Sequence, residues 1–341
     1  MTPLIHNRNS FFDLRPEDRV LIGDMHYVVE KHVQGGMGCV CMLWKDLDKS
    51  PRKMSALGLK LALKAVLPDA TCVEGASLFR RELTVWSGFR HFNIIWLLEI
   101  IDGGNAGWLA AMDWCPWSLR DLLKKERRLS IEDSSFIISS ILEGLAYAYE
   151  KDQVIHLDLK PENILIHLDP SKLMEITESH INNKSLNHYR FMVSDWGIAS
   201  VKQLALNRVA SLPLSSNSAQ KTFNNVGTLL YMSPERFKEG FSSSLKSDIF
   251  SLGMIYSELL TGKLPFVNGA HPILSLITGQ YIDELNRQLD SKYIPKKVKE
   301  LILGMVAYNP RERISDYNVL RKELLKAAGK SLGIIAKILG K

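Results

Sequence analysis

The sequence predicts an α+β protein in two parts, with most strands in the first third and mainly helices after it. Residues 59–66 alternate in polarity as a strand does, and residues 108–112 form an apolar run of strand length. Helical patterns follow at 118–125 and 131–150, the second starting after Ser130. The chain of 341 residues is long enough for two hydrophobic cores.

Composition and charge narrow the class of protein. Hydrophobic residues make up 46% and charged residues 23% of the chain, which is usual for a globular protein. The net charge of +6 comes mainly from residues 321–341, where six lysines and arginines accompany one glutamate. The rest of the chain is close to neutral, so we expect no nucleic-acid partner.

The cysteines and the first residues indicate a reducing compartment. Cys39, Cys41, Cys72 and Cys115 show no metal-ligand spacing, and we expect reduced, buried thiols. Residues 1–19 carry no apolar segment of a signal peptide, and no run reaches the roughly 18 apolar residues that span a bilayer. We therefore expect a cytoplasmic protein.

The stretch Val154–Ile166 carries the chemistry on which the functional prediction depends. A polar loop between two apolar runs presents Asp158, Lys160 and Asn163. A carboxylate can accept a hydroxyl proton, an ammonium group can neutralise a moving phosphoryl group, and an amide oxygen can bind Mg²⁺. The alternative is a polar surface loop between two elements.

This stretch resembles the catalytic loop of protein kinases, H-R-D-x-K-x-x-N, with Leu157 in the place of the arginine. The lysine two residues after the aspartate resembles the serine/threonine group. The resemblance implies that Asp158 and Lys160 are catalytic and that Asn163 is a ligand of Mg²⁺, or of Mn²⁺ in its place. It also implies ATP as the phosphate donor and a protein with a Ser or Thr acceptor as the partner.

A glycine-rich turn between two strand patterns gives a second match. Glycines let backbone N–H groups approach phosphate oxygens, because no Cβ stands in the way. The turn resembles the kinase loop G-x-G-x-x-G-x-V at Gly35, Gly38 and Val40, with Gly36 also in the turn and Val33 in the place of the first glycine. A plain hairpin turn is the alternative.

The next matches concern the phosphates and the adenine ring of ATP. The run at 61–64 resembles the V-A-I-K strand of kinases, in which the lysine, here Lys64, holds the phosphates. By the same resemblance Ala62 and Val40 lie against the adenine, and Glu82 pairs with Lys64. A surface lysine and a solvated helix charge are the alternatives.

Residues 108–113 resemble the strand and hinge that join the two lobes of a kinase. The resemblance implies that Met112 guards the back pocket and that backbone groups of Asp113 and Cys115 bond the adenine edge. Leu165 is also expected to contact the nucleotide. The boundary between the lobes then falls near residues 113–118.

An aspartate after a short apolar run supplies the second metal ligand. Ser194-Asp195-Trp196-Gly197 resembles the D-F-G motif, with Trp196 in the place of the phenylalanine, and implies that Asp195 binds Mg²⁺. The polar residues 167–190 between the two strands look like an insertion. Their histidines match no metal-ligand pattern, so a solvated loop is expected there.

Later segments complete the resemblance. The run from Gly227 to Glu235 resembles G-T-x-x-Y-x-A-P-E and implies an ion pair between Glu235 and Arg313. Asp248 opens a stretch that resembles the central buried helix and is expected to brace the backbone of the catalytic loop. Gly262 is expected to end that helix.

The Ser- and Asn-rich residues 198–226 resemble a kinase activation loop. In many kinases the arginine before the catalytic aspartate binds a phosphate placed on this loop. Leu157 has neither a charge nor a donor, so we expect activity not to depend on phosphorylation through that contact.

The role of the C-terminal residues stays open. Residues 319–341 repeat apolar side chains near helical spacing, with lysines largely on another face. A basic amphipathic helix can lie on an anionic membrane surface, where the protein would act as a docked scaffold. The alternatives are packing on the large lobe, a flexible tail or contact with a partner, and packing or a flexible tail is favoured over membrane contact, because solvated basic faces are common.

Together the matches predict a bilobal protein-kinase-like fold of class α+β. The kinase domain is expected at 20–325, with a β-rich N-lobe at about 20–113 and a mainly helical C-lobe at about 117–325, after an extension at 1–19 and before a basic tail at 326–341. The expected activity is that of a serine/threonine kinase, with some likeness to the bacterial type. The alternative is a pseudokinase that binds a nucleotide or a partner.

Overall fold

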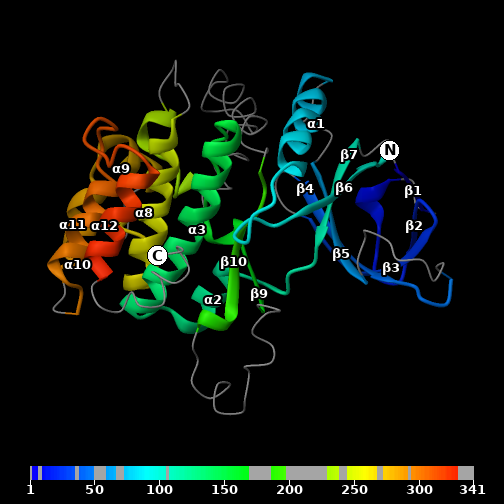
Figure 1. The fold of residues 1–341 in the computed structure, drawn as a ribbon, viewed down its shortest axis with the longest axis horizontal. Helices are drawn as coiled ribbons and strands as arrows, with labels where there is room; N and C mark the ends of the chain where they lie inside the picture. The colour runs from blue at the N-terminus through cyan, green and yellow to red at the C-terminus, as the bar shows by residue number, and fades with distance from the viewer. Residues whose placement is uncertain are drawn as a thin grey trace, which may run out of the picture. The chain divides into compact units, whose positions relative to one another are not determined.

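The structure is a computed structural model that describes residues 2–6, 10–34, 38–49, 59–66, 73–104, 107–168, 186–196, 229–237, 244–266, 272–290 and 293–328. The chain divides into two compact units (Figure 1). The first comprises residues 1–115 and 195–224, and the second comprises residues 116–194 and 225–341. The predicted α+β class and bilobal organisation are confirmed, since the first unit is built mainly of strands and the second mainly of helices.

The strands of the first unit close into a barrel in the order β1-β2-β3-β4-β5-β7-β6. Their bounds are β1 Thr2–His6, β2 Arg19–Ile22, β3 Met25–Gln34, β4 Gly38–Lys45, β5 Lys60–Val66, β6 Leu97–Asp102 and β7 Trp108–Asp113. Neighbours are antiparallel except at the closure, where β1 runs parallel to β6 with Thr2 opposite Ile101. Closing the sheet in this way pairs its edges. β1 lies in the predicted N-terminal extension at 1–19, where the sequence pattern predicts no strand.

Side-chain alternation explains how the barrel is filled, because successive side chains of a strand point to opposite faces. On β4 and β5 every second residue enters one buried cluster, with Cys39 and Cys41 among them. Burial raises the pKa of both thiols to about 12, so they stay protonated. With Cys115 they are the buried free thiols that the sequence predicts, while Cys72 lies outside the described residues.

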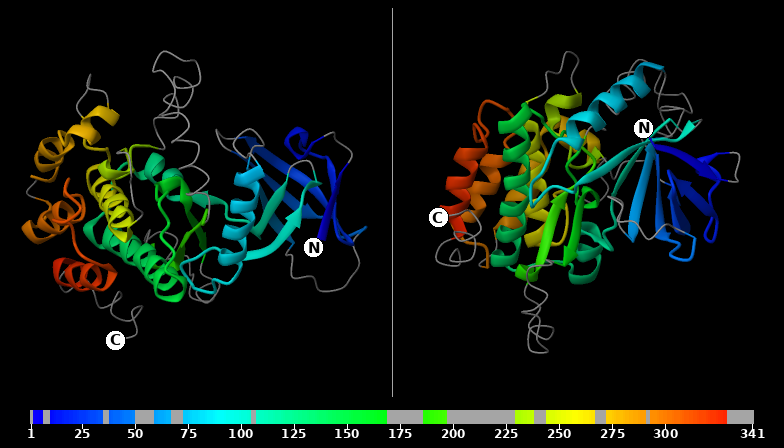
Figure 2. Two further views of the ribbon diagram at one scale, coloured as in Figure 1. Left: turned by 90° about the horizontal axis from the view of Figure 1, so that it is seen from above. Right: turned by 45° about the vertical axis from the view of Figure 1, so that its right-hand side comes forward.

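The helix α1, Val73–Ser87, packs against β6 and β7 (Figure 2). The described side chains of this helix, from Phe79 on, are not part of the cluster inside the barrel, so this part of the helix covers the outside of these strands. Near its end the buried Trp86 donates from Nε1 to the carbonyl of Ile95 at 2.9 Å. This bond satisfies the indole and fixes where the helix gives way to the next segment.

The second unit is built mainly of helices around α8, which packs against α3, α10 and α11 (Figure 2). The helices are α2 Leu119–Glu126, α3 Ile131–Asp152, α8 Leu245–Thr261, α9 Pro272–Thr278, α10 Tyr281–Leu289, α11 Lys296–Met305 and α12 Tyr317–Ala328, with short 3₁₀ helices η4 Pro161–Asn163, η6 Leu186–His188 and η7 Pro234–Phe237. A further 3₁₀ helix, η1 Phe11–Asp13, lies in the first unit. All residues of α8 from Ser247 to Leu260 are buried, which makes it the centre of the unit.

A small antiparallel sheet in the order β10-β9-β8 completes the second unit. Its strands are β8 Trp117–Ser118, β9 Ile164–Leu168 and β10 Tyr189–Val193. β9 and β10 pair directly, Ile164 opposite Val193, although the expected insertion lies between them in sequence. His188 is buried in η6, so the expectation of a solvated loop is wrong at this histidine.

Helix ends follow from local residues. The side chain of Ser118 caps α2 and forms a reciprocal capping box with Asp121, and Ser130 caps α3. α8 ends at Gly262, as the sequence predicts, with φ 77°. A Cβ at this position would lie 2.7 Å from the carbonyl oxygen of Arg127, so the turn requires glycine.

No helix in the part of the chain that the structure describes is long and apolar enough to cross a membrane. The description of α12 ends at Ala328, so most of the predicted basic tail lies outside the described residues.

Candidate active site

The polar side chains of the predicted catalytic loop converge in the second unit. Asn163 donates from Nδ2 to the carboxylate Oδ2 of Asp158 and to its main-chain oxygen, both at 2.8 Å. The ammonium nitrogen of Lys160 lies 3.8 Å from the same carboxylate oxygen. Asp158 is 7% exposed, and its Oδ2 contacts both the amide of Asn163 and the ammonium group of Lys160, which together restrict the orientation of the carboxylate.

The loop backbone is fixed to the central helix, as expected for Asp248. The carboxylate of Asp248 accepts from the N–H of His156 and of Leu157, both at 2.7 Å, and from the hydroxyl of Tyr317 at 3.2 Å. Complete burial raises the pKa of Asp248, although its hydrogen bonds oppose the shift. On the other side, Nε2 of His156 bonds the carbonyl oxygen of Ser194 at 2.7 Å, next to Asp195 in sequence.

A second network joins the loop to α2 and α8 through Arg120. This guanidinium donates to the carboxylate of Glu162 at 2.8 Å and to that of Glu258 at 2.7 Å. It also bonds the hydroxyl of Tyr231, which in turn donates to Glu258. Burial, and then the charge of Glu258, raises the pKa of Tyr231 well above its ordinary value. Helices α2, η4 and α8 and the turn at Tyr231, which are distant in sequence, thus meet at one guanidinium.

The segment after residue 228 is fixed by the predicted ion pair. Arg313 donates from two nitrogens to the two carboxylate oxygens of Glu235, each at 2.7 Å, and the arginine side chain is fully buried. Burial favours a higher pKa for Glu235, but the hydrogen bonds and charge of Arg313 hold it below its ordinary value. The ion pair between Glu235 and Arg313 is therefore confirmed.

In the first unit, residues predicted to hold the nucleotide share the outer face of the barrel. Val40 is paired with Lys64 across β4 and β5, and Ala62 is paired with Met112 across β5 and β7. Their neighbours in sequence point into the barrel, so these four side chains lie on the opposite face. Lys64 forms an ion pair with Asp195, the predicted metal ligand.

The remaining predicted contacts are only partly described. Glu82 lies on α1 and is partly buried, and its pairing with Lys64 stays a prediction. At the hinge Asp113 is exposed and Cys115 is buried, while Leu165 is partly buried on β9. Gly35 and Gly36 lie outside the described residues, and Gly38 begins β4.

Trp196, the departure from the D-F-G pattern, is accommodated in the first unit. It is 1% exposed and packs edge-to-face on Phe89, with 5.3 Å between ring centroids. Edge-to-face geometry is one that aromatic pairs favour. The larger ring therefore has a defined packing site next to Asp195.

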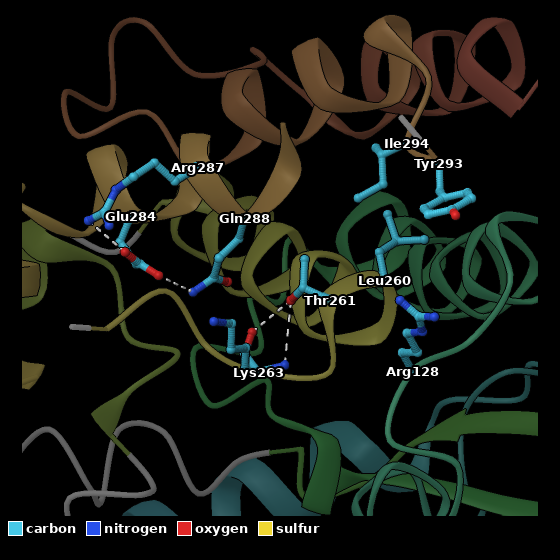
Figure 3. Close-up of a pocket in the computed structure, with 9 residues that line it drawn as sticks. All are labelled: Arg128, Leu260, Thr261, Lys263, Glu284, Arg287, Gln288, Tyr293 and Ile294. Atoms are coloured by element: carbon cyan, nitrogen blue, oxygen red, sulfur yellow. Dashed lines mark hydrogen bonds and ion pairs between the residues drawn. The ribbon is translucent and has the colours of Figure 1, made fainter. Parts of the chain in front are cut away.

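A separate pocket of about 370 Å³ opens beside the C-terminal end of α8 (Figure 3). Charged and polar side chains dominate its lining, and Glu284 bridges Arg287 at 2.6 Å and Gln288 at 2.9 Å. None of the predicted site residues lines it. Its volume is near the lower end for ligand pockets.

Two arginines that contact the loop and its surroundings, Arg120 and Arg236, were not predicted from the sequence. Arg120 looks like an ordinary charge in a helical pattern, and Arg236 follows the matched segment directly. Both are held by partners far away in sequence, with Arg120 next to Glu258 and Arg236 next to Leu157. The apolar residues around Arg120 indicate a helix that packs on a core, but they do not indicate which acids bind Arg120, because Glu162 and Glu258 are brought near it only by folding. Among the described residues, no group of three His, Cys, Asp or Glu side chains is placed to hold a metal.

Comparison with known proteins agrees with this geometry. The family profile described as "Protein kinase domain" matches residues 49–325. The chain is 26% identical over 235 residues to the serine/threonine-protein kinase PrkC of Bacillus subtilis, a match that covers 69% of this chain and 31% of that protein. It is 25% identical over 292 residues to serine/threonine-protein kinase 33 of Bos taurus, covering 85% of this chain and 53% of that protein.

A third relative is mitogen-activated protein kinase kinase 1 of Arabidopsis thaliana, 31% identical over 191 residues, which cover 55% of this chain and 41% of that protein. Each match therefore spans about a third to a half of the relative's length. The profile match covers most of the chain and includes the catalytic loop, the hinge and the segment around Glu235. The chain belongs to the protein kinase family.

Proposed function

We propose that the protein is an active serine/threonine kinase that transfers the γ-phosphoryl group of ATP to a protein hydroxyl. The observation that carries the proposal is the fixed carboxylate of Asp158, held by Asn163 and accompanied by Lys160. Relatives named as serine/threonine kinases support the choice of acceptor.

Asp158 is assigned the role of orienting the acceptor hydroxyl and taking its proton as the oxygen attacks the γ-phosphorus. The bond from that phosphorus to the bridging oxygen breaks, and ADP leaves with the electron pair. The ammonium nitrogen of Lys160, 3.8 Å from the carboxylate of Asp158, would neutralise charge on the transferred group. The proton and the phosphoryl group are thus both accounted for.

The donor atoms present fit a hard divalent cation. Asn163 commits Nδ2 to Asp158, which turns its amide oxygen Oδ1 away for another ligand. We assign Asn163 and the carboxylate of Asp195 to Mg²⁺, with Mn²⁺ as a substitute, because both prefer oxygen ligands. The cation supplies charge neutralisation of the phosphates when it is bound.

Lys64 is assigned to the phosphates of ATP, and its ion pair with Asp195 brings the two groups to one place in the first unit. Val40, Ala62 and Met112 offer an apolar face for the adenine ring. Glu82 is assigned to position Lys64, the hinge backbone at Asp113 and Cys115 to bond the adenine edge, and Leu165 to contact the ring. Backbone N–H groups at Gly35, Gly36 and Gly38 would cradle the phosphates.

The competing function is that of a pseudokinase, favoured by the departures at Val33, Leu157 and Trp196. The packing of Trp196 on Phe89 and the hydrogen bond from Asn163 to Asp158, next to Leu157, support the active kinase at two of these three departures. A docked scaffold acting through the basic tail is a further candidate. Sedimentation with anionic vesicles, full chain beside residues 1–318, would discard that role if both bind equally.

The test is transfer of labelled γ-phosphate from Mg·ATP to the protein itself and to a generic basic substrate protein. We expect label with the wild type and none with Asp158→Ala. Nucleotide binding without transfer in both, across several substrates, would favour the pseudokinase. Equal label in both would assign the activity to a contaminant.

A further inference from the structure

Leu157 holds a backbone conformation that its side chain does not favour. Its φ is +60°, in the left-handed region, where a residue with a Cβ is strained. Such a conformation persists only where the surroundings determine it. Because Leu157 directly precedes Asp158, whatever fixes this residue also fixes the direction of the proposed catalytic carboxylate.

Two buried charges hold the peptide groups on either side of Leu157. Its N–H donates to Oδ1 of Asp248 at 2.7 Å, and its carbonyl oxygen accepts a hydrogen bond from Nη1 of Arg236. Asp248 is an acid on α8, and Arg236 is a base in η7. The carboxyl group of a buried acid thus accepts from the N–H of the strained residue, and a buried guanidinium donates to its carbonyl oxygen.

Arg236 is a fixed charge inside the second unit. The residue is 6% exposed and interacts electrostatically with Asp158, Asp248 and Glu235. Burial lowers its pKa, while these three carboxylates oppose the shift. A guanidinium stays protonated in proteins, so a positive charge is held beside the loop at all ordinary pH values.

The backbone that carries Arg236 is itself fixed in the fold. Arg236 follows Glu235, which Arg313 holds through two hydrogen bonds, so segment 234–237 is anchored. The side chain of Arg236 reaches across 79 positions of sequence to the loop. Leu157 supplies no charge of its own at this place.

We propose that Arg236 is the positioning residue of the catalytic loop. From the anchored segment 234–237, its guanidinium binds the carbonyl oxygen of Leu157 and so keeps Leu157 in its strained conformation, with Asp158 directly after it. The inference rests on the proposed kinase function. The contact joins the guanidinium of Arg236 to a main-chain carbonyl oxygen. Neither group requires a modification, so alignment of Asp158 through this contact needs no added phosphate.

The kinetic test compares Arg236→Met, Arg236→Lys and Arg321→Met. Arg321 is the matched control, because it forms a partly buried bidentate pair with Glu143 at 2.7 and 2.8 Å, between α12 and α3. We expect Arg236→Met to lower kcat at least about tenfold with KM for Mg·ATP within about twofold of wild type. We expect Arg236→Lys to recover most of the loss and Arg321→Met to leave kcat unchanged.

A lower kcat with an unchanged KM separates positioning from general support of the fold. Loss of general support would lower melting temperature, kcat and nucleotide affinity together. An unchanged kcat in Arg236→Met would overturn the proposal. A loss in which Arg236→Lys is no better than Arg236→Met, with matching losses of melting temperature, would overturn it as well.

Hydrogen exchange distinguishes failure of this inference from failure of the kinase proposal, since it needs no activity. In Arg236→Met we expect amides of residues 156–163 to exchange at least about tenfold faster, while those of α8 stay as in wild type. That result with an inactive wild type would uphold the positioning role and reject the kinase proposal. Unchanged exchange at 156–163 would reject the positioning role whatever the activity.

Discussion

At the scale of single residues, Asp158 shows how a short polar loop becomes a defined chemical group. The carboxylate is nearly buried, and it is kept in place by the amide of Asn163 and the ammonium of Lys160. A buried carboxylate without such partners would be strongly destabilised. The polar residues Asn163 and Lys160 of the loop therefore orient one acid, Asp158.

Trp196 offers a test of packing at the same scale. Trp196→Ala should lower the free energy of unfolding by about 3–5 kcal/mol, because the ring is fully buried against Phe89 and its removal leaves a cavity. Urea denaturation measures the change. The matched control is Trp117→Ala, which should cost less than about 0.5 kcal/mol because Trp117 is 49% exposed. Equal losses would show that the Trp196 packing is not formed.

At the scale of elements, the catalytic loop is held from several directions by parts far apart in sequence. Asp248 on α8 fixes its backbone, Arg120 on α2 binds Glu162 next to it, and Arg236 in η7 binds Leu157. These contacts join the loop to one buried acid and two arginines, and an arginine stays protonated in proteins. The arrangement makes alignment of the loop a property of the folded unit.

A prediction at this scale concerns the serine- and threonine-bearing residues that resemble an activation loop in sequence. Simultaneous alanine substitution of Ser211, Ser215, Ser216, Ser218 and Thr222, which lie outside the described residues, should leave kcat within about threefold of wild type. The reason is that Leu157 offers no donor to a phosphate on that loop, whereas Arg236 is already engaged. Initial rates at saturating Mg·ATP measure this. Abolished activity in the alanine variant would refute it.

At the scale of the whole molecule, the ion pair of Glu235 and Arg313 couples stability to pH. The pKa of Glu235 is lower in the folded protein than its ordinary value of 4.5, so the pair stabilises the fold above that pH. This contribution is lost as pH falls through the lowered pKa, when the carboxylate takes up a proton.

Glu235→Gln should therefore lower the free energy of unfolding at neutral pH by about 3 kcal/mol, since Arg313 is left buried without its anion. Its stability should also depend less on pH below about 4.5 than that of wild type. Denaturant titrations at several pH values measure both effects. The control is Glu300→Gln, whose pair with Lys296 is exposed and should contribute less than about 1 kcal/mol. Parallel pH curves for Glu235→Gln and wild type would contradict the account.

Much of the fold and the site could be predicted because their signals are local. Asp158, Lys160 and Asn163 stand within six positions, and Gly262 ends α8 where the turn leaves no room for a Cβ. β1 is only five residues long and is defined by its pairing with β2 and with β6, which its own residues do not reveal. The roles of Arg120 and Arg236 were equally hidden, since a charged side chain in sequence does not reveal which distant groups will bury it.

The central claim is that Asp158 performs chemistry and does not merely help to bind nucleotide. The most direct measurement is kcat for phosphoryl transfer by Asp158→Asn beside wild type, with the Kd of Mg·ATP determined for both. The account predicts that kcat falls by about 100- to 10,000-fold while Kd stays within about threefold. An unchanged kcat, or a loss of transfer explained entirely by weaker nucleotide binding, would contradict it.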